Sequence, residues 1–169
     1  MLDCEGKVIV SPWRLDFTPA ACNCDVTPHR TTWETDPLSK TISRPDAPNH
    51  FMVLRPVQKK IVIRLPNGPV LASSAQAIRL MESGKSLYDP VLYLPRDDVS
   101  APLTTQSNHS FCPLKGEASY FGYDDGDTKI DDLAWSYGAP LDFSEPIKGL
   151  IAFYANKVII EEHPLLREA

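Results

Sequence analysis

The sequence predicts a mainly β protein, with a minor helical part, that folds as a single compact antiparallel β-sheet domain carrying two short helices. Its 169 residues include 16 prolines but only eight glycines, and each interior proline would remove a backbone donor from a helix and clash with the preceding turn. Short strand-like runs are joined by hairpin-type turns, which favours antiparallel pairing. With 43% hydrophobic and 23% charged residues, the chain can bury a core without disulfides, and a disordered, collagen-like or coiled-coil protein is excluded.

Residues 1–50 are expected to form an extended, proline-rich arm, and residues 51–169 the β-rich domain. Six of the prolines lie in the arm, and only residues 7–10 look like a strand there. Terminal segments of this kind are often ordered only by what they contact. The aromatic residues expected to anchor the arm are Trp13, Phe17 and Trp33.

The first elements of the domain are predicted to be a hairpin and a short helix. Residues 60–65 and 69–72 are two β-rich runs around Asn67-Gly68, and an Asn-Gly pair is the strongest short-range hairpin signal. A serine at 73 or 74 can then cap a helix over residues 77–81, where apolar side chains fall at helical spacing.

Two further β segments are predicted in the middle of the domain. Residues 90–95 read as a strand bracketed by prolines, which makes it short or places it at a sheet edge. Residues 118–123 and 128–137 flank the acidic turn 124–127, and this turn chemistry predicts a second hairpin.

The domain is predicted to end with the second helix and a last strand. Ser144-Glu145-Pro146 combines a cap, an acid and a proline at the first helical position, so residues 147–154 are expected to be helical. Residues 157–161 read as the final strand. The expected total is five or six strands.

The protein is predicted to be cytoplasmic, without nucleic acid or membrane as a partner. No run approaches 18 apolar residues, and the first ten residues carry Asp3 and Glu5 where a signal peptide needs basic residues. Its four cysteines are expected to be free thiols. The net charge of −5 gives no basic footprint for nucleic acid. Both a monomer and a homodimer stay open.

The most informative segment is residues 111–118, Phe-Cys-Pro-Leu-Lys-Gly-Glu-Ala. A proline and a glycine fix a turn that can hold the Cys112 thiol near the Lys115 ammonium, and a neighbouring cation makes a thiol more nucleophilic. His109 lies close enough in sequence to act as a base. The alternative is that Cys112 is packed and Lys115 is an ordinary surface residue.

A second cluster of chemistry-bearing residues lies at 131–137, Asp-Asp-Leu-Ala-Trp-Ser-Tyr. In a regular strand Asp131, Trp135 and Tyr137 share one face, which suits a pocket with aromatic walls and an acidic anchor. The same alternation also fits a half-buried strand, and both interpretations stay open.

These clusters, together with segments 92–99 and 147–154, resemble the domain-of-unknown-function family 427, also called nucleotidyltransferase-9-like. The resemblance covers residues 54–161, and its most specific parts are segments 112–116, 132–137 and 152–154. It implies a compact β-rich fold similar to the β-tent class, with a cleft near residues 112–116.

In family terms the conserved acid matches Asp132 rather than Asp131, and a bulge in the strand would reconcile this with the face pattern. Position 114 is Leu where the family usually has an aromatic residue. The family label suggests nucleotidyl transfer, although the chain has no Gly-rich phosphate loop.

The sequence thus predicts a small-molecule site, for a nucleotide or phosphorylated metabolite, with catalysis open. The predicted catalytic residues are Cys112, Lys115 and Asp132, and the predicted ligand contacts are His109, Gly116, Glu117, Trp135 and Tyr137. The alternative is a non-catalytic structural or protein-interaction module in which Lys115 pairs with Asp131 or Asp132 and Trp135 fills the core.

No metal site is expected, and the sequence identifies no cofactor. The spacing of Cys4, Cys22, Cys24 and His29 is irregular for zinc. The aspartates at 124–132 could in principle hold Mg²⁺, but a solvated turn accounts for the first three of them.

Overall fold

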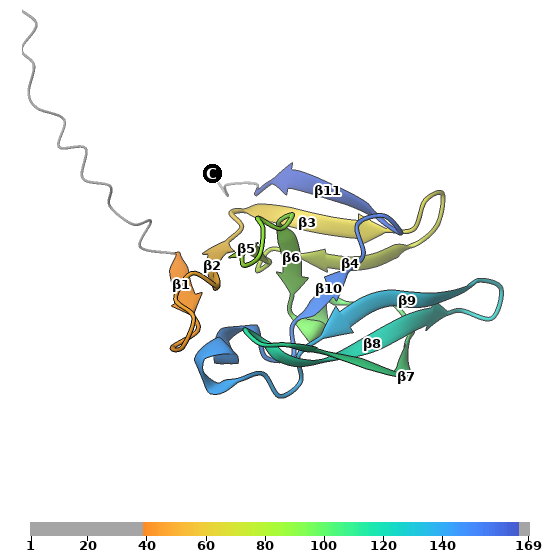
Figure 1. Cartoon of the computed structure of the whole chain (residues 1–169). Coiled ribbons are helices and arrows are strands. Elements are labelled where there is room, and N and C mark those ends of the chain that lie inside the picture. Colours follow the sequence, from red (N-terminus) through yellow and green to blue (C-terminus); the bar gives the residue numbers. More distant parts are fainter. Residues whose placement is uncertain (1–38, 166–169) are drawn as a thin grey trace, which may run out of the picture. The chain divides into compact units, whose positions relative to one another are not determined.

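The structure, a computed structural model, describes residues 39–165 as two antiparallel sheets with two short 3₁₀ helices (Figure 1). The larger sheet contains, in spatial order, β1 (Lys40–Ser43), β2 (Phe51–Pro56), β5 (Ile78–Ser83), β6 (Val91–Leu94), β10 (Ile151–Phe153), β9 (Lys129–Ser136), β8 (Gly116–Asp124) and β7 (Leu103–Cys112). The smaller sheet contains β11 (Ile159–Pro164), β3 (Lys59–Arg64) and β4 (Val70–Ser74). The 3₁₀ helices are η1 (Arg96–Asp98) and η2 (Asp142–Ile147).

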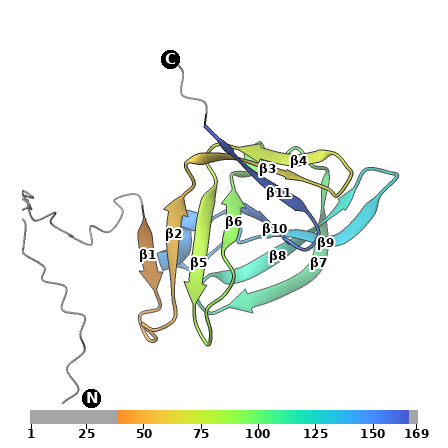
Figure 2. The same cartoon turned by 90° about the horizontal axis from the view of Figure 1, so that it is seen from above.

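The mainly β, antiparallel prediction is confirmed, but the strands form two sheets rather than one. Strands β1, β2, β5 and β6 lie side by side in the larger sheet (Figure 2), although the β3–β4 hairpin separates β2 from β5 in the sequence. The predicted strand at 7–10 and the arm anchors lie outside the described residues. Within the segment predicted as arm, β1 pairs with β2.

The two predicted hairpins are present. β3 pairs with β4 around Asn67, whose φ of 55° is the left-handed conformation that an Asn-Gly turn uses. β8 pairs with β9 around the acidic turn, where Asp124 and Asp125 accept hydrogen bonds from backbone N–H groups of the turn. These carboxylates stabilise the turn itself.

Neither predicted α-helix forms. Residues 78–83 are β5, because pairing with β2 on one side and β6 on the other satisfies a backbone that would make only a marginal short helix. The Ser74 hydroxyl accepts a hydrogen bond from the Gln76 N–H at 3.0 Å, so it stabilises a local turn rather than a helix.

The second predicted helix is replaced by η2 and β10. The Ser-Glu-Pro run forms the 3₁₀ helix, Gly149 adopts a φ of 69°, and the chain then enters a central strand between β6 and β9. All three residues of β10 are buried, and a continuous apolar run suits a strand covered on both faces.

The core has two parts. The smaller sheet packs its buried apolar residues, such as Ile61, Ile63 and Leu71, with Leu133, Ala134 and Phe153 of the larger sheet. A second cluster joins β2, β5, β6 and η2 beneath the β7–β8 turn. Within residues 39–165, no helix has the length and apolar character needed to span a membrane.

Candidate functional site

The predicted Cys-Pro-x-Lys-Gly segment is the turn that joins β7 to β8. Cys112 pairs with Gly116 across the hairpin, and the Cys112 carbonyl accepts a hydrogen bond from the Lys115 N–H at 3.1 Å. Gly116 has a φ of +102°, and a Cβ there would lie 3.2 Å from the backbone nitrogen of Leu141. Both the conformation and the close approach require glycine at this position.

The turn is anchored to η2 by a buried contact. Leu114 is fully buried, and its carbonyl accepts a hydrogen bond from the Ser144 hydroxyl at 2.6 Å. The Lys115 carbonyl also accepts one from the Leu141 N–H at 3.1 Å. Leu114 therefore holds the turn on the core, which fixes the direction of Lys115.

Lys115 forms a buried ion pair with Glu82 at the end of β5. The two side chains are only 8% and 12% exposed, and the second Glu82 oxygen lies 3.0 Å from His50 Nε2. The expectation that Lys115 would pair with Asp131 or Asp132 is therefore wrong. The predicted helix at 77–81 gives no reason to expect Glu82 near Lys115. In the structure residues 78–83 form strand β5, whose end lies beside the β7–β8 turn.

Lys115 lines two adjoining cavities, of about 710 Å³ and about 200 Å³, which share Glu82, Tyr88, Lys115 and Tyr137. We call these two cavities together the Lys115 cleft. The larger cavity is also lined by Arg44, Ala47, Asn49, His50, Gly84, Lys85, Phe111, Cys112 and Pro113. The smaller one is also lined by Leu80, Asp89, Val91, Tyr93, Tyr120, Trp135 and Tyr154.

Aromatic side chains line both cavities of the cleft. Phe111 and Tyr88 are 68% and 46% exposed where they line the larger cavity. At the smaller cavity, the Trp135 indole donates from Nε1 to the Tyr93 hydroxyl at 3.2 Å, and its ring centroid lies 4.6 Å from that of Tyr154. Trp135 is half-buried.

Burial raises the pKa of both Tyr93 and Tyr137 well above the ordinary value of 10.0. Both phenols therefore stay neutral at physiological pH, and the Tyr93 hydroxyl accepts the hydrogen bond from Trp135. The Lys115 ammonium also lies 5.9 Å from the centroid of the Tyr137 ring, within cation–π range.

Asp132 lies at a bulge in β9. Gly122 of β8 stands opposite Asp131, Asp132 and Leu133, between regular pairs on either side. Asp132 has a φ of 48°, and its carboxylate accepts a hydrogen bond from Asn108 Nδ2 at 2.8 Å. A bulge of the kind that would reconcile the family match at Asp132 with the face pattern is therefore present in β9.

Asp132 is not among the residues that line the Lys115 cleft, but its carboxylate lies close enough to Tyr154 to affect the pKa of that phenol. Burial is the main cause that raises the pKa of Tyr154, and Tyr120 and the Asp132 carboxylate add to it. The Lys157 ammonium donates to the backbone carbonyls of Asp131 and Asp132, both at 2.9 Å. Asp132 thus stands beside the aromatic end of the cleft.

The other predicted site residues occupy different positions. Trp135 and Tyr137 line the cleft with Lys115, and Cys112 lines its larger cavity. On the β7–β8 ribbon, outside the cleft, His109 Nδ1 lies 3.5 Å from Glu117 Oε1, and the two side chains are 45% and 69% exposed. Sequence reasoning did not find Glu82, His50 or Tyr88, which come from segments remote from either motif.

The fold and the cleft define a mainly β protein of two antiparallel sheets with a polar, aromatic-lined cleft. The chain belongs to the NTP_transf_9 family, a domain of unknown function (DUF427), whose model matches residues 53–163. The match includes both motif segments, whereas His50 precedes it. A comparison with curated proteins gives no significant match.

Proposed function

We propose that the protein binds a small molecule that combines a planar ring with an anionic group, such as a nucleotide or another phosphorylated metabolite, in the Lys115 cleft. The observation that supports this most is that a nearly buried ammonium, that of Lys115, lines both cavities of a cleft with aromatic side chains around it. Clefts that combine apolar walls with a few convergent polar groups are the usual form of small-molecule sites.

The basic side chains of the larger cavity support an anionic ligand. Arg44, Lys85 and Lys115 line it with one carboxylate, that of Glu82. Arg44 pairs with Asp46 at 2.6 Å, and Lys115 pairs with Glu82. An ammonium has three N–H donors, so the pairing with Glu82 leaves Lys115 able to donate to a ligand as well.

The exposed aromatic rings support a planar ligand group. Phe111 and Tyr88 keep large exposed fractions at the cleft, where a nucleobase or similar ring can stack. A Cβ on Gly84 would lie 3.1 Å from the His50 ring and 3.3 Å from the Tyr88 ring. A glycine at this position therefore allows both rings to approach the backbone beside the cleft.

The proposal concerns binding, and catalytic roles for Cys112, Lys115 and Asp132 stay predictions. The expected location is the cytoplasm, where a free Cys112 thiol persists. A second candidate is a non-catalytic structural or protein-interaction module. The burial of Leu114 and of the Lys115–Glu82 pair favours this candidate, because the motif residues would then serve as core and turn elements of the domain.

A thermal-denaturation panel separates the two candidates. The full chain is heated with AMP, GMP, CMP or UMP, with adenosine, and with ribose 5-phosphate. We expect at least one nucleotide to raise the Tm more than adenosine or ribose 5-phosphate does, because only the nucleotide reaches both the aromatic and the basic part of the cleft. Calorimetric titration then gives its affinity.

The matched variants are Phe111→Ala and Leu87→Ala. Both side chains are exposed, at 68% and 82%, but only Phe111 is among the cleft residues. Phe111→Ala is expected to weaken nucleotide binding about tenfold, and Leu87→Ala to leave it unchanged. The proposal fails if no compound in the panel shifts the Tm, or if the two variants bind equally well.

A further inference from the structure

A further pocket, which we call the Phe153 pocket, lies where the two sheets meet, next to the smaller cavity of the Lys115 cleft. Its volume is about 410 Å³. Ile63 and Ile160 of the smaller sheet line it, together with Trp135 and residues 89–92 and 153–155 of the larger sheet and its loops. The pocket therefore draws on both sheets, whereas the Lys115 cleft draws on the larger sheet and its loops.

The walls of the Phe153 pocket are mainly apolar. Ile63 and Phe153 belong to the buried core, and Leu92 and Ile160 pack against this core while they stay partly exposed. The core between the two sheets is thus incompletely covered at this point. A hydrocarbon group that entered the pocket would bury apolar surface, and each CH₂ placed there would strengthen binding about fourfold.

The Phe153 pocket adjoins the smaller cavity of the cleft. Asp89, Val91, Trp135 and Tyr154 line both spaces. The rings of Trp135 and Tyr154 are in contact, with centroids 4.6 Å apart, so this aromatic pair stands at their boundary. Lys115 in turn lines both cavities of the cleft. The larger cavity, the smaller cavity and the Phe153 pocket therefore follow one another in a row.

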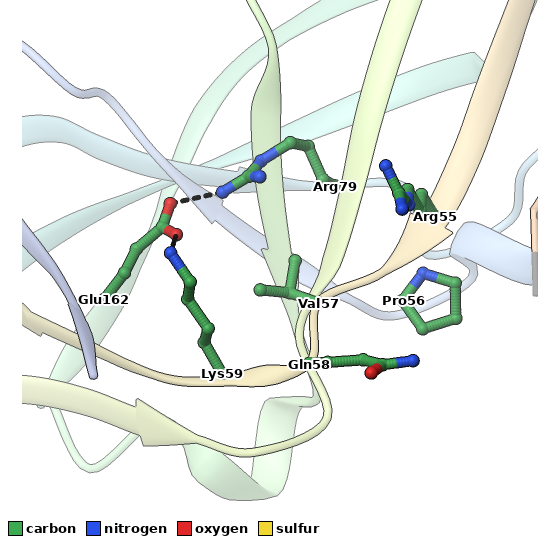
Figure 3. Close-up of a pocket in the computed structure, with 7 residues that line it drawn as sticks. All are labelled: Arg55, Pro56, Val57, Gln58, Lys59, Arg79 and Glu162. Carbon is green, nitrogen blue, oxygen red and sulfur yellow. Dashed lines mark hydrogen bonds and ion pairs between the residues drawn. The ribbon is translucent and has the colours of Figure 1, made fainter. Parts of the chain in front are cut away.

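The two ends of this row differ in charge. Among the described residues, two lysines and one carboxylate line the larger cavity beside an arginine that is paired elsewhere. At the Phe153 pocket the carboxylates are in excess, because Asp89 and Glu162 line it with Arg79, and Arg79 is paired with Glu162 (Figure 3). An anionic group is therefore favoured at the Lys115 end and disfavoured at the Phe153 end.

We propose that the ligand of the Lys115 cleft is a nucleotide whose phosphate carries a hydrocarbon group, and that the Phe153 pocket binds this group. The proposal rests on the proposed function of the cleft. With the phosphate beside Lys115, the base lies toward Phe111 and Tyr88 in the larger cavity, and the hydrocarbon chain passes Trp135 into the pocket. This order of base, phosphate and chain matches the order of aromatic, basic and apolar surfaces along the row.

The test compares the methyl, butyl and hexyl phosphate esters of AMP, which carry the same charge, by calorimetric titration of the full chain. We expect the hexyl ester to bind at least about tenfold more tightly than the methyl ester, because several of its methylenes lie in the pocket. Ala155→Glu adds a carboxylate at an exposed position of the pocket lining and is expected to remove most of this gain. Ala75→Glu, at an exposed turn position outside the row, is the matched control and is expected to keep it.

A separate arm uses 1-hexanol, which has no anionic group, and is expected to shift the backbone amides of residues 91, 92 and 153–155 in NMR spectra. The proposal is overturned if the methyl and hexyl esters bind equally well, or if Ala155→Glu and Ala75→Glu show the same gain. If AMP binds but neither 1-hexanol nor the hexyl chain has an effect, the Phe153 pocket alone fails. If AMP and its esters do not bind while 1-hexanol shifts these amides, the nucleotide site fails and the pocket is retained as an apolar site.

Discussion

The Lys115 cleft and a second pocket, lined by residues 55–59, Arg79 and Glu162 (Figure 3), both contain ion pairs, but these pairs are buried to different extents. In the cleft, Lys115 and Glu82 form a nearly buried ion pair. In the second pocket, Glu162 is 30% exposed and is shared by Lys59 and Arg79. Breaking a buried pair is strongly destabilising, whereas exposed pairs contribute little. Substitutions at the Lys115–Glu82 pair are therefore expected to lower stability strongly, and those at the Glu162 pairs to change it little.

The largest expected effect is that of Lys115→Met. It leaves the Glu82 carboxylate without its partner in a nearly buried position, so the free energy of unfolding should fall by about 3–5 kcal/mol. Urea denaturation measures this loss. The double variant Lys115→Met/Glu82→Met removes both charges and should recover much of the stability.

Lys148→Met is the matched control for Lys115→Met. Lys148 pairs with Glu145 at 3.1 Å, but the two side chains are 55% and 60% exposed, so the loss should stay below about 0.5 kcal/mol. Equal losses for Lys115→Met and Lys148→Met would remove the distinction between the buried and the exposed charges.

Gly116→Ala tests whether the turn of the cleft depends on backbone conformation. A φ of +102° and a Cβ position 3.2 Å from Leu141 N should make alanine cost about 1–3 kcal/mol. Gly138→Ala is the control, because among the described residues no atom comes within 4 Å of its Cβ position. Thermal denaturation that gave the same small change for both variants would contradict this account of the turn.

Ser144→Ala tests the anchor between η2 and the β7–β8 turn. The variant removes the hydrogen bond to the buried Leu114 carbonyl and should destabilise the fold by about 1–2 kcal/mol. Ser100→Ala is a useful comparison, because the Leu71 carbonyl that Ser100 Oγ contacts also accepts two backbone N–H bonds. A smaller loss in chemical denaturation is therefore expected for Ser100→Ala, and the reverse order would count against the anchor.

The smallest effect concerns the pH dependence of stability at Glu162, in the second pocket. Lys59 is the main cause that lowers the pKa of Glu162 below its ordinary value of 4.5, and Arg79 adds to it. Because the folded-state pKa is the lower one, this contribution is present above about pH 4.5 and is lost as the pH falls through the lowered value. Glu162→Gln should therefore reduce the loss of stability on acidification below pH 4.5. Acid titrations of the two proteins that superimpose would show that the pocket charges do not affect stability.

Local turn chemistry allowed the hairpins to be predicted from the sequence. Asn67-Gly68 and the acidic turn 124–127 carry their conformational preferences within a few residues, and the structure has a hairpin at each. The segment 77–81 lacked such information, because its apolar spacing fits a helix as well as the strand that pairs with β2 and β6. Strands such as β7, rich in exposed polar residues, are defined by their partners rather than by an apolar pattern.

The contrast between local sequence information and long-range strand pairing applies to the cleft as well. Cys112, Lys115, Trp135 and Tyr137 could be chosen as candidates because they cluster in two short motifs, and all four line the cleft. Glu82 and His50 are brought to Lys115 only by pairing between distant strands. The ion pairs of Glu162 with Lys59 and Arg79 likewise depend on how distant strands are arranged, which no local pattern states.

The most direct test of the central claim is to follow backbone amide chemical shifts by NMR while AMP is titrated into the full chain. AMP is predicted to shift the amides of the non-proline residues in 82–88 and 111–116, which lie around the Lys115 cleft. If saturating AMP left the amides of 82–88 and 111–116 in place, the assignment of the Lys115 cleft as a ligand site would be contradicted.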